Sequence, residues 1–311
     1  MSRKTILVTG ATGKQGGAVV NALLNIPEAA GFNILAVTRN TASKSAQALS
    51  QRSPSIKLVQ GDLNEPSKIF ENAKQITTDA IWGVFSVQTP MGGSDLEELQ
   101  GKALIEESLK NNVSHFVYSS VDRNGEKSYD NPTPIPHFIS KHNIEHHLHE
   151  QTDGGEKMSF TVLRPVAFFD NLANGFIGKA FSSAWKVAVK ERPLQLIAVS
   201  DIGWFAAQAF ISADKPEYKN QSIALAGDSL AWADAAKVFK GKVGKEMPTT
   251  WDAVAKGFMW AAWSEFGVMM YWFYDEGYGA DIEGLRKLKP DLLDFGSWLE
   301  KDSQFKDQIR K

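Results

Sequence analysis

The sequence predicts an α/β protein built on a doubly wound parallel sheet, with a smaller, mostly helical C-terminal lobe. Three observations predict this class. Short apolar runs alternate with longer helical patterns, which is typical of a parallel sheet covered on both faces. The first apolar run leads into the glycine-rich stretch VTGATGKQGG, Val8–Gly17. The later part of the chain is helical in pattern and rich in aromatic residues.

The composition bounds the class of protein further. The chain has 311 residues, of which 43% are hydrophobic and 23% charged, enough for one large α/β domain or a domain with a cap. A net charge of −2 and a pI near 6.3 provide no strong field to attract nucleic acid or an anionic membrane, so no direct binding to either is expected. Cysteine is absent, which excludes disulfides, a thiol nucleophile and a cysteine redox switch.

The location of the protein is predicted from its apolar segments. The stretch MSRKTILVTG leads directly into a strand pattern, so no signal peptide is expected. The most apolar stretch, Phe258–Tyr274, is interrupted by Ser264 and Glu265 and is short for a membrane span. We therefore expect a cytoplasmic or nuclear protein.

The strands and helices of the sheet follow one another along the chain. The expected strands are Thr5–Thr9, Asn33–Thr38, Ile56–Gln60, Ala80–Val87, His115–Ser119 and Ser159–Leu163. The helices expected between them are Gln15–Leu24, Leu96–Asn111 and Phe138–His149. Two later strands, Gln195–Val199 and Ser222–Ala226, are expected to return to the same sheet.

This order divides the chain into a core and a lobe. Residues 1–165 form the nucleotide-binding core, completed by strands and a helix within 194–227. Residues 166–193 and 228–311 form the smaller lobe over the strand ends, where open α/β sheets bind ligands. The aromatic segment 251–274 belongs to the core of this lobe, to an apolar substrate pocket or to a protein-binding surface.

The glycine-rich stretch predicts a phosphate-binding turn of the Rossmann type. Gly10 permits the tight turn, Gly13 lets the backbone approach a pyrophosphate, and Gly16 lets the helix pack closely on the strand. The free N–H groups at the helix start then face the anion. The residues expected to contact a dinucleotide here are Gly10, Ala11, Thr12, Gly13, Lys14, Gln15 and Gly16.

The end of the second strand discriminates between dinucleotides. An acidic residue there would bind the ribose hydroxyls of NAD. The sequence instead reads AVTRN, with Arg39 at that point and no carboxylate before Asp62. A guanidinium group binds a 2′-phosphate bidentately, and Lys44 adds a second cation. We therefore expect NADP(H) as the cofactor; the alternative is that Arg39 is a solvated surface residue.

Two further strand ends complete the predicted cofactor site by their place in the topology. Asp62 and Leu63 follow the third strand in QGDL, where an adenine edge often rests. Val87, Gln88 and Thr89 follow the fourth strand and are expected beside the nicotinamide ribose.

The ordered set of motifs resembles the NmrA-like family of atypical short-chain dehydrogenase/reductases. The motifs, which run over nearly the whole chain, are GATGKQGG, VTRN, QGDL, VFSVQTP, HFISK, LRPVAFFDN and EGYGADIEGLRKLKPDL. The resemblance implies an extended Rossmann fold, NADP(H) binding, and a nicotinamide side lined by Pro165 and Phe168. It also implies two kinds of function. Some members are redox sensors and negative transcriptional regulators that do not turn NADP(H) over, whereas relatives resembling isoflavone reductase are NADPH-dependent reductases.

The helix after the fifth strand bears on catalysis. A standard short-chain dehydrogenase has Tyr-x-x-x-Lys there, where the Tyr donates a proton and the Lys holds the ribose and lowers the Tyr pKa. In PIPHFISK, Lys141 occupies the Lys position and His137 the Tyr position. The resemblance implies that Lys141 binds the ribose, whereas His137 is a packed side chain, a substitute acid or a mark of lost activity. Ser119 or Ser120 lies where the family has its catalytic Ser, or simply ends the strand.

The same helix carries a group of metal-binding residue types. His142, Glu145, His146 and His149 share one helix face, a spacing that can hold a metal. No second ligand set is evident in the sequence, so we expect a solvated helix face and assign no metal.

Two functions remain from the sequence. One is a sensor of the NADP(H)/NAD(P) state that works by occupancy of the nucleotide site and acts through a protein partner such as a transcriptional regulator. The other is an NADPH-dependent reductase that uses Lys141 on a small aromatic or apolar carbonyl, enone or quinone.

Overall fold

The computed structural model describes residues 4–89, 93–251, 257 and 263–309. The chain forms two compact units: the first comprises residues 1–120, 139–164 and 202–223, and the second comprises residues 121–138, 165–201 and 224–311. Each unit has its own cluster of buried apolar side chains.

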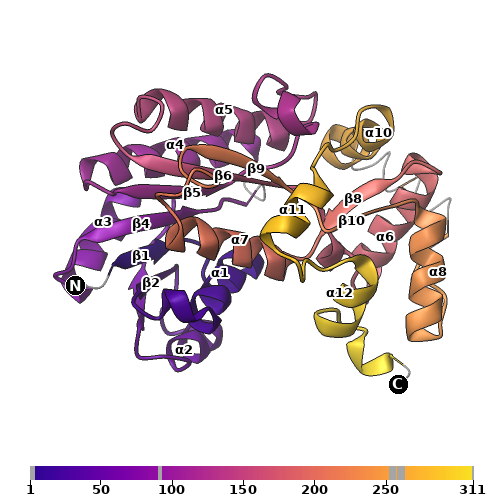
Figure 1. Ribbon diagram of the computed structural model, residues 1–311, viewed down its shortest axis with the longest axis horizontal. Helices are drawn as coiled ribbons and strands as arrows, with labels where there is room; N and C mark the ends of the chain where they lie inside the picture. The colour runs from indigo at the N-terminus through magenta and orange to yellow at the C-terminus, as the bar shows by residue number, and fades with distance from the viewer. Residues whose placement is uncertain (1–3, 90–92, 252–256, 258–262, 310–311) are drawn as a thin grey trace. The chain divides into compact units, whose positions relative to one another are not determined.

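A seven-stranded sheet belongs to the first unit, apart from the last residues of two strands (Figure 1). Its strands are β1 (Thr5–Val8), β2 (Asn33–Thr38), β3 (Ile56–Gln60), β4 (Ile81–Ser86), β5 (His115–Ser119), β6 (Ser159–Pro165) and β9 (Gln221–Leu225). They lie in the order β3-β2-β1-β4-β5-β6-β9, and neighbours among the first six pair in parallel. The winding direction therefore reverses between β1 and β4, the place where such sheets bind ligands.

Helices cover both faces of this sheet. They are α1 (Lys14–Asn25), α2 (Lys44–Ser50), α3 (Pro66–Ile76), α4 (Ser94–Lys110), α5 (Pro136–Gln151) and α7 (Val199–Ile211), with the short turn η1 (Pro27–Ala29) after α1. Figure 1 shows α4 and α5 on one side of the sheet and α1 and α7 on the other. Strand β1 is buried along its whole length, as expected of a central strand covered on both faces.

The second unit is built around a small sheet and an aromatic core. The sheet has the order β10-β8-β7, with β7 (Ala167–Phe168) parallel and β10 (Asp228–Leu230) antiparallel to β8 (Leu194–Ile197). Its helices are α6 (Phe176–Ala184), α8 (Trp232–Val243), α10 (Val268–Asp275), α11 (Ile282–Leu288) and α12 (Phe295–Lys301). Its short helical turns are η3 (Gly125–Tyr129), η4 (Phe169–Asn171), η5 (Trp185–Val189), η6 (Trp263–Gly267) and η7 (Lys306–Gln308). Phe169 stacks on Trp298 at 5.4 Å in its core.

The predicted fold class is confirmed, and one strand was assigned to the wrong sheet. Strand Gln195–Val199 was expected to return to the main sheet, but β8 lies in the small sheet of the second unit. An apolar run in the sequence predicts a strand, but it does not determine with which strands that strand pairs. Here β8 pairs with β7 and β10, and the N–H of Gly227 donates to the carbonyl of Leu196 at 2.7 Å. The functional division into a nucleotide core and a substrate or partner lobe stays a prediction.

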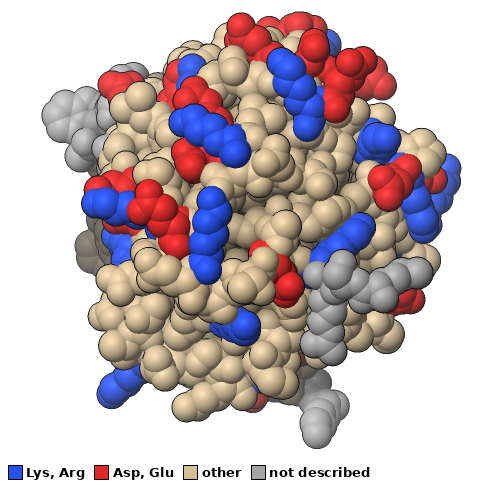
Figure 2. Space-filling view, turned by 90° about the vertical axis from the view of Figure 1, so that its left-hand side faces the viewer, with Lys and Arg blue, Asp and Glu red and all other residues tan. Residues whose placement is uncertain are grey.

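Charges of both signs are mixed on the surface. Figure 2 shows Lys and Arg side chains interspersed with Asp and Glu side chains on one face of the molecule. Among the described residues, no helix combines the length and the apolar character that crossing a membrane requires.

Candidate functional site

The glycine turn joins β1 to α1 at the point where the winding reverses. Gly10 has a φ of +59°, in the left-handed region that favours glycine, and its carbonyl accepts the N–H of Gly13 at 2.8 Å. A Cβ on Gly16 would lie 2.3 Å from the carbonyl oxygen of Gly10. The turn therefore needs glycine at Gly10 for its conformation and at Gly16 for the close approach of helix and strand.

The turn presents backbone donors at the start of α1. Gly13 caps the helix without a side-chain hydrogen bond, and the first helical turn carries no acidic residue. The first N–H groups of a helix have no partner inside it, and the helix dipole favours an anion beside them. Thr12 and Lys14 are exposed, Gln15 is half-buried and Ala11 is buried. This arrangement can bind a phosphate group.

Thr9 connects the turn to the end of β4. Its hydroxyl donates to the carbonyl of Phe85 at 3.0 Å and accepts the N–H of Val87 at 3.0 Å. Val87 thereby lies against the turn, and a Cβ on Gly10 would be 3.1 Å from its side chain. Sequence reasoning overlooked Thr9, although a hydroxyl at the end of a buried apolar strand was a usable signal.

Gln88 follows Val87 and is almost fully buried. Its amide nitrogen donates to the hydroxyl of Ser86 at 2.8 Å, while its Oε1 has no hydrogen-bond partner among the described residues. A buried acceptor without a donor is costly, and it can be satisfied by a ligand. Thr89, the next residue, is exposed.

Two exposed cations follow β2. Arg39 comes directly after the strand, and Lys44 is the first residue of α2. Neither takes part in an ion pair with any residue that the structure describes. The neighbouring strand end brings Asp62 and Leu63 to the same edge, because the N–H of Gly61 donates to the carbonyl of Thr38 at 3.0 Å. The Asp62 carboxylate accepts the N–H of Asn64 at 2.9 Å.

Lys141 lies at the end of β5 and is held by a buried carboxylate. Its Nζ is 2.9 Å from Oε1 of Glu97 and donates to the carbonyl of Ser119 at 3.3 Å. The Lys141 side chain is 12% exposed, and that of Glu97 is fully buried. The Nζ also lies 5.8 Å from the ring centroid of Tyr118. Sequence reasoning did not single out Glu97; its only signal was its place on the buried face of α4, four residues before Gly101.

The two candidate serines have different partners. The Ser119 hydroxyl donates to Oε1 of Gln15 at 2.6 Å and so contacts the glycine turn. The Ser120 hydroxyl donates to Glu145, which is fully buried and pairs with Arg164 at 2.6 Å. Ser119 therefore faces the glycine turn, and Ser120 belongs to a buried polar network.

The expected solvated face of α5 was wrong. Glu145 is fully buried because it pairs with Arg164 from β6, and the ring of His149 packs on Phe160 at 4.6 Å. Burial lowers the pKa of His149. The ring centroids of His142 and His146 are 4.3 Å apart, with the two rings tilted by 40°. Among the described residues no group of three His, Asp or Glu side chains is arranged to hold a metal ion.

The remaining predicted site residues belong to the second unit. His137 stands one helical turn before Lys141; its Nδ1 lies 3.6 Å from Oε2 of Glu265, and its ring meets Phe138 edge-on at 4.8 Å. It is thus packed and paired with a carboxylate. Pro165 ends β6, and Phe168 is half-buried in β7.

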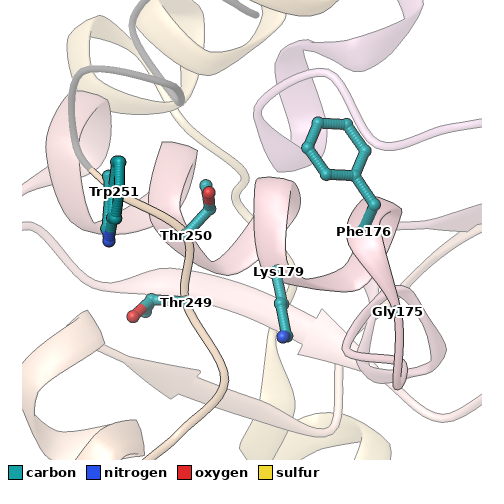
Figure 3. A pocket seen from close by; sticks show the side chains of 6 residues that line it. All are labelled: Gly175, Phe176, Lys179, Thr249, Thr250 and Trp251. Atoms are coloured by element: carbon teal, nitrogen blue, oxygen red, sulfur yellow. The ribbon is translucent and has the colours of Figure 1, made fainter.

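A pocket of about 380 Å³ lies within the second unit. Figure 3 shows Phe176 and Trp251 at opposite ends of it, with Lys179 and Thr250 between them. Phe176 is 56% and Trp251 83% exposed. Within the aromatic segment 251–274, Trp251 therefore lines this pocket, whereas Trp272 is buried in the core of the second unit. Its members Phe258 and Trp260 lie outside the described residues, as does the side chain of Trp263.

Comparison with known proteins gives one family match. The model of the NmrA-like family matches residues 2–283, which confirms the resemblance found in the motifs. The NmrA-like family domain-containing oxidoreductase lnaB of Aspergillus flavus is 30% identical over 126 residues, 38% of this chain and 34% of its own. An NmrA-like family domain-containing protein of Dictyostelium discoideum is 28% identical over 175 residues, 56% of this chain and 54% of its own. The chain thus spans about a third to about half of the length of these relatives.

Solved structures share the fold. Triphenylmethane reductase of Citrobacter sp., complexed with NADP(H), has a TM-score of 0.72 at 18% identity and covers 96% of this chain and 99% of its own. An NADPH-dependent quinone oxidoreductase of Escherichia coli, complexed with NADPH, has a TM-score of 0.70 at 18% identity, with coverage of 95% and 98%. NmrA, a negative transcriptional regulator in complex with NAD, has a TM-score of 0.67 at 15% identity, with coverage of 97% and 96%.

Proposed function

Because the chain belongs to the NmrA-like family, we propose that it binds NADP(H) along the strand ends of its first unit and signals the state of that site to a protein partner. One observation carries the binding proposal. The turn after β1 has the left-handed Gly10, the tight contact at Gly16 and a helix start without a side-chain cap, which together suit a pyrophosphate.

The other strand ends support the remaining parts of the dinucleotide. Arg39 and Lys44 are exposed cations suited to a 2′-phosphate. Asp62 and Leu63 would flank the adenine. The unsatisfied Oε1 of Gln88 suits an amide donor such as the nicotinamide carboxamide, and Lys141 suits the ribose hydroxyls. Two of the neighbouring structures are NADP(H) or NADPH complexes by title, and the third is an NAD complex.

Sensing is the function that the helix after β5 supports best. The position of the usual tyrosine is taken by His137, whose ring packs on Phe138 and whose Nδ1 faces Glu265. A protein that binds NADP(H) but lacks the ordinary proton donor is suited to respond to the occupancy of its nucleotide site. The bond from Ser119 to Gln15 links the glycine turn to β5 and offers a path for that response. The partner would be a transcriptional regulator, met in the cytoplasm or the nucleus.

A second function, an NADPH-dependent reductase, is favoured by Lys141. Its ammonium group is anchored by Glu97 and would donate a hydrogen bond to oxygen that gains negative charge after hydride transfer. The substrate of this reductase would be a small aromatic or apolar carbonyl, enone or quinone. Relatives and neighbours named as oxidoreductases or reductases add support.

Nucleotide titration tests the cofactor proposal. Arg39→Asp is expected to weaken NADPH about 10- to 100-fold, the worth of a lost charge-assisted hydrogen bond, and to change NADH little. The matched control is Arg52→Asp, because Arg52 is also exposed in the first unit but donates to Asn21 at 2.6 Å. Equal losses of NADPH and NADH in Arg39→Asp would overturn the assignment of the 2′-phosphate.

Turnover separates the sensor from the reductase. NADPH consumption is measured with quinones, enones and aldehydes on the wild type and on the double variant Glu97→Gln/Lys141→Met, which removes both buried charges together. The sensor predicts tight NADPH binding without turnover across the panel. Turnover that disappears in the double variant would overturn the sensor and support the reductase.

A further inference from the structure

Helices α4 and α5 are fixed in register within the first unit by a row of contacts. The Ser140 hydroxyl donates to the carbonyl of Ser94 at 2.9 Å. A Cβ on Gly101 would lie 2.5 Å from the side chain of Ile144, so the two helices touch there. The remaining contacts are Asn143 to Glu98 at 2.7 Å and His147 to Glu106 at 3.3 Å. Contacts with α4 thus lie both before and after Lys141 on α5, and they fix the position of Lys141 relative to α4.

Glu97 lies on α4 among these contacts and faces Lys141 on α5. It is fully buried, and among the described residues Lys141 is the cation within ion-pair distance of it. A buried carboxylate is retained only where it is paired. Glu97 therefore confines the ammonium group of Lys141 to one place at the end of β5.

The ammonium group keeps capacity for a ligand. A lysine has three N–H donors. The Nζ of Lys141 donates to the carbonyl of Ser119 and lies at ion-pair distance from Glu97, which leaves it a donor for a group bound at the end of β5. The Lys141 side chain is 12% exposed while Glu97 is sealed, so a ligand would meet the lysine and not the carboxylate.

We propose that Glu97 is the positioning residue for Lys141 and sets the affinity of the nucleotide site without touching the nucleotide. The inference rests on the proposed binding of NADP(H). Since the ribose beside the nicotinamide is common to both dinucleotides, Glu97 acts on NADPH and NADH equally, unlike Arg39.

Titration calorimetry on a set of variants tests the proposal. The set is the wild type, Glu97→Gln, Lys141→Met, the double variant and Glu98→Gln. Glu97→Gln and Lys141→Met are each expected to weaken NADPH and NADH about tenfold, and the double variant to bind like Lys141→Met. Glu98→Gln is the matched control, because Glu98 contacts Lys102 and Asn143 on the same helix pair and should stay within about twofold of the wild type.

The outcomes separate this inference from the proposed function. If the wild type binds neither dinucleotide, the proposed function fails. If Lys141→Met weakens binding and folded Glu97→Gln does not, the role of Glu97 is overturned while NADP(H) binding stands. If Glu97→Gln does not fold, the double variant carries the test, since it buries no unpaired charge. If the double variant binds NADPH clearly more weakly than Lys141→Met does, the effects of the two substitutions are additive. The damage is then only structural, and the proposal is overturned.

Discussion

Each unit contains a buried lysine–carboxylate pair, and the two pairs are completed differently. In the first unit, Glu97 and Lys141 are 2.9 Å apart. In the second unit, Lys289 lies 3.3 Å from Asp201 and 2.8 Å from Asp291. The Asp201 carboxylate also accepts the backbone N–H of Leu293 at 3.0 Å. Both pairs are nearly sealed from solvent, so burial does not distinguish them.

The difference lies in the hydrogen bonds around each pair. In the second unit, Asp201 accepts the backbone N–H of Leu293, and Lys289 has Asp291 as a second carboxylate partner. This pair connects the start of α7 to the segment after α11. The oxygens of Glu97 have no hydrogen bond from the backbone among the described residues, and Lys141 keeps a donor. A pair with its bonds complete stabilises the fold, whereas a pair with spare capacity is suited to a ligand.

The largest expected effect is on stability and applies to both pairs. Lys141→Met and Lys289→Met each leave a buried carboxylate unpaired, which costs about 3–5 kcal/mol of unfolding free energy. Burial already raises the pKa of Asp201 against the attraction of Lys289. Urea unfolding measures both losses.

Nucleotide binding then separates the two variants. Lys289→Met is expected to keep the NADPH affinity of the wild type at a temperature where it remains folded, and Lys141→Met is expected to lose affinity. Equal loss of NADPH affinity in the two would contradict the distinction between a structural and a positioning pair.

His115 is another buried titratable group, and it forms no ion pair with any residue that the structure describes. Its Nδ1 lies 2.9 Å from the Ser159 hydroxyl and its Nε2 lies 3.3 Å from the Thr161 hydroxyl. Burial lowers its pKa to about 4. The unfolded chain binds this proton near 6.5, so between pH 6.5 and 4 the unfolded state holds more protons. Stability is therefore complete above pH 6.5 and falls as the pH drops, by about 3 kcal/mol at pH 4.

Urea unfolding at pH 7 and pH 4 measures this effect against His115→Gln. The loss on acidification should be smaller in the variant by most of that amount, because glutamine does not titrate. A loss of the same size in both proteins would show that His115 is not held neutral by the fold. The difference between the two losses gives the cost of burying a titratable side chain outside an ion pair, where burial outweighs the attraction of Asp214.

Local patterns predicted the parts of the site that depend on neighbours in the chain. The requirements at Gly10 and Gly16 arise within one turn, and the places of Arg39 and Lys141 follow from where a strand or helix begins or ends. Glu97 was not predicted, because its partner is on another helix and the pairing depends on how α4 packs against α5. The burial of Glu145 depends likewise on Arg164 from β6, and the sheet that β8 joins depends on strands on either side of it in the sequence.

The smallest expected effect tests whether the packing register of α4 against α5, rather than the carboxylate of Glu97, places Lys141. Ser140→Ala removes the bond to the carbonyl of Ser94, on the residue next to Lys141, and should cost about 1 kcal/mol of stability. Because the contact of Gly101 with Ile144 and the Glu97–Lys141 pair remain, NADPH affinity should change less than about twofold. Calorimetry on Ser140→Ala beside Glu97→Gln measures this. Similar losses of affinity in both variants would mean that any loosening of α4 against α5 disturbs Lys141, and the carboxylate would then have no special part in placing it.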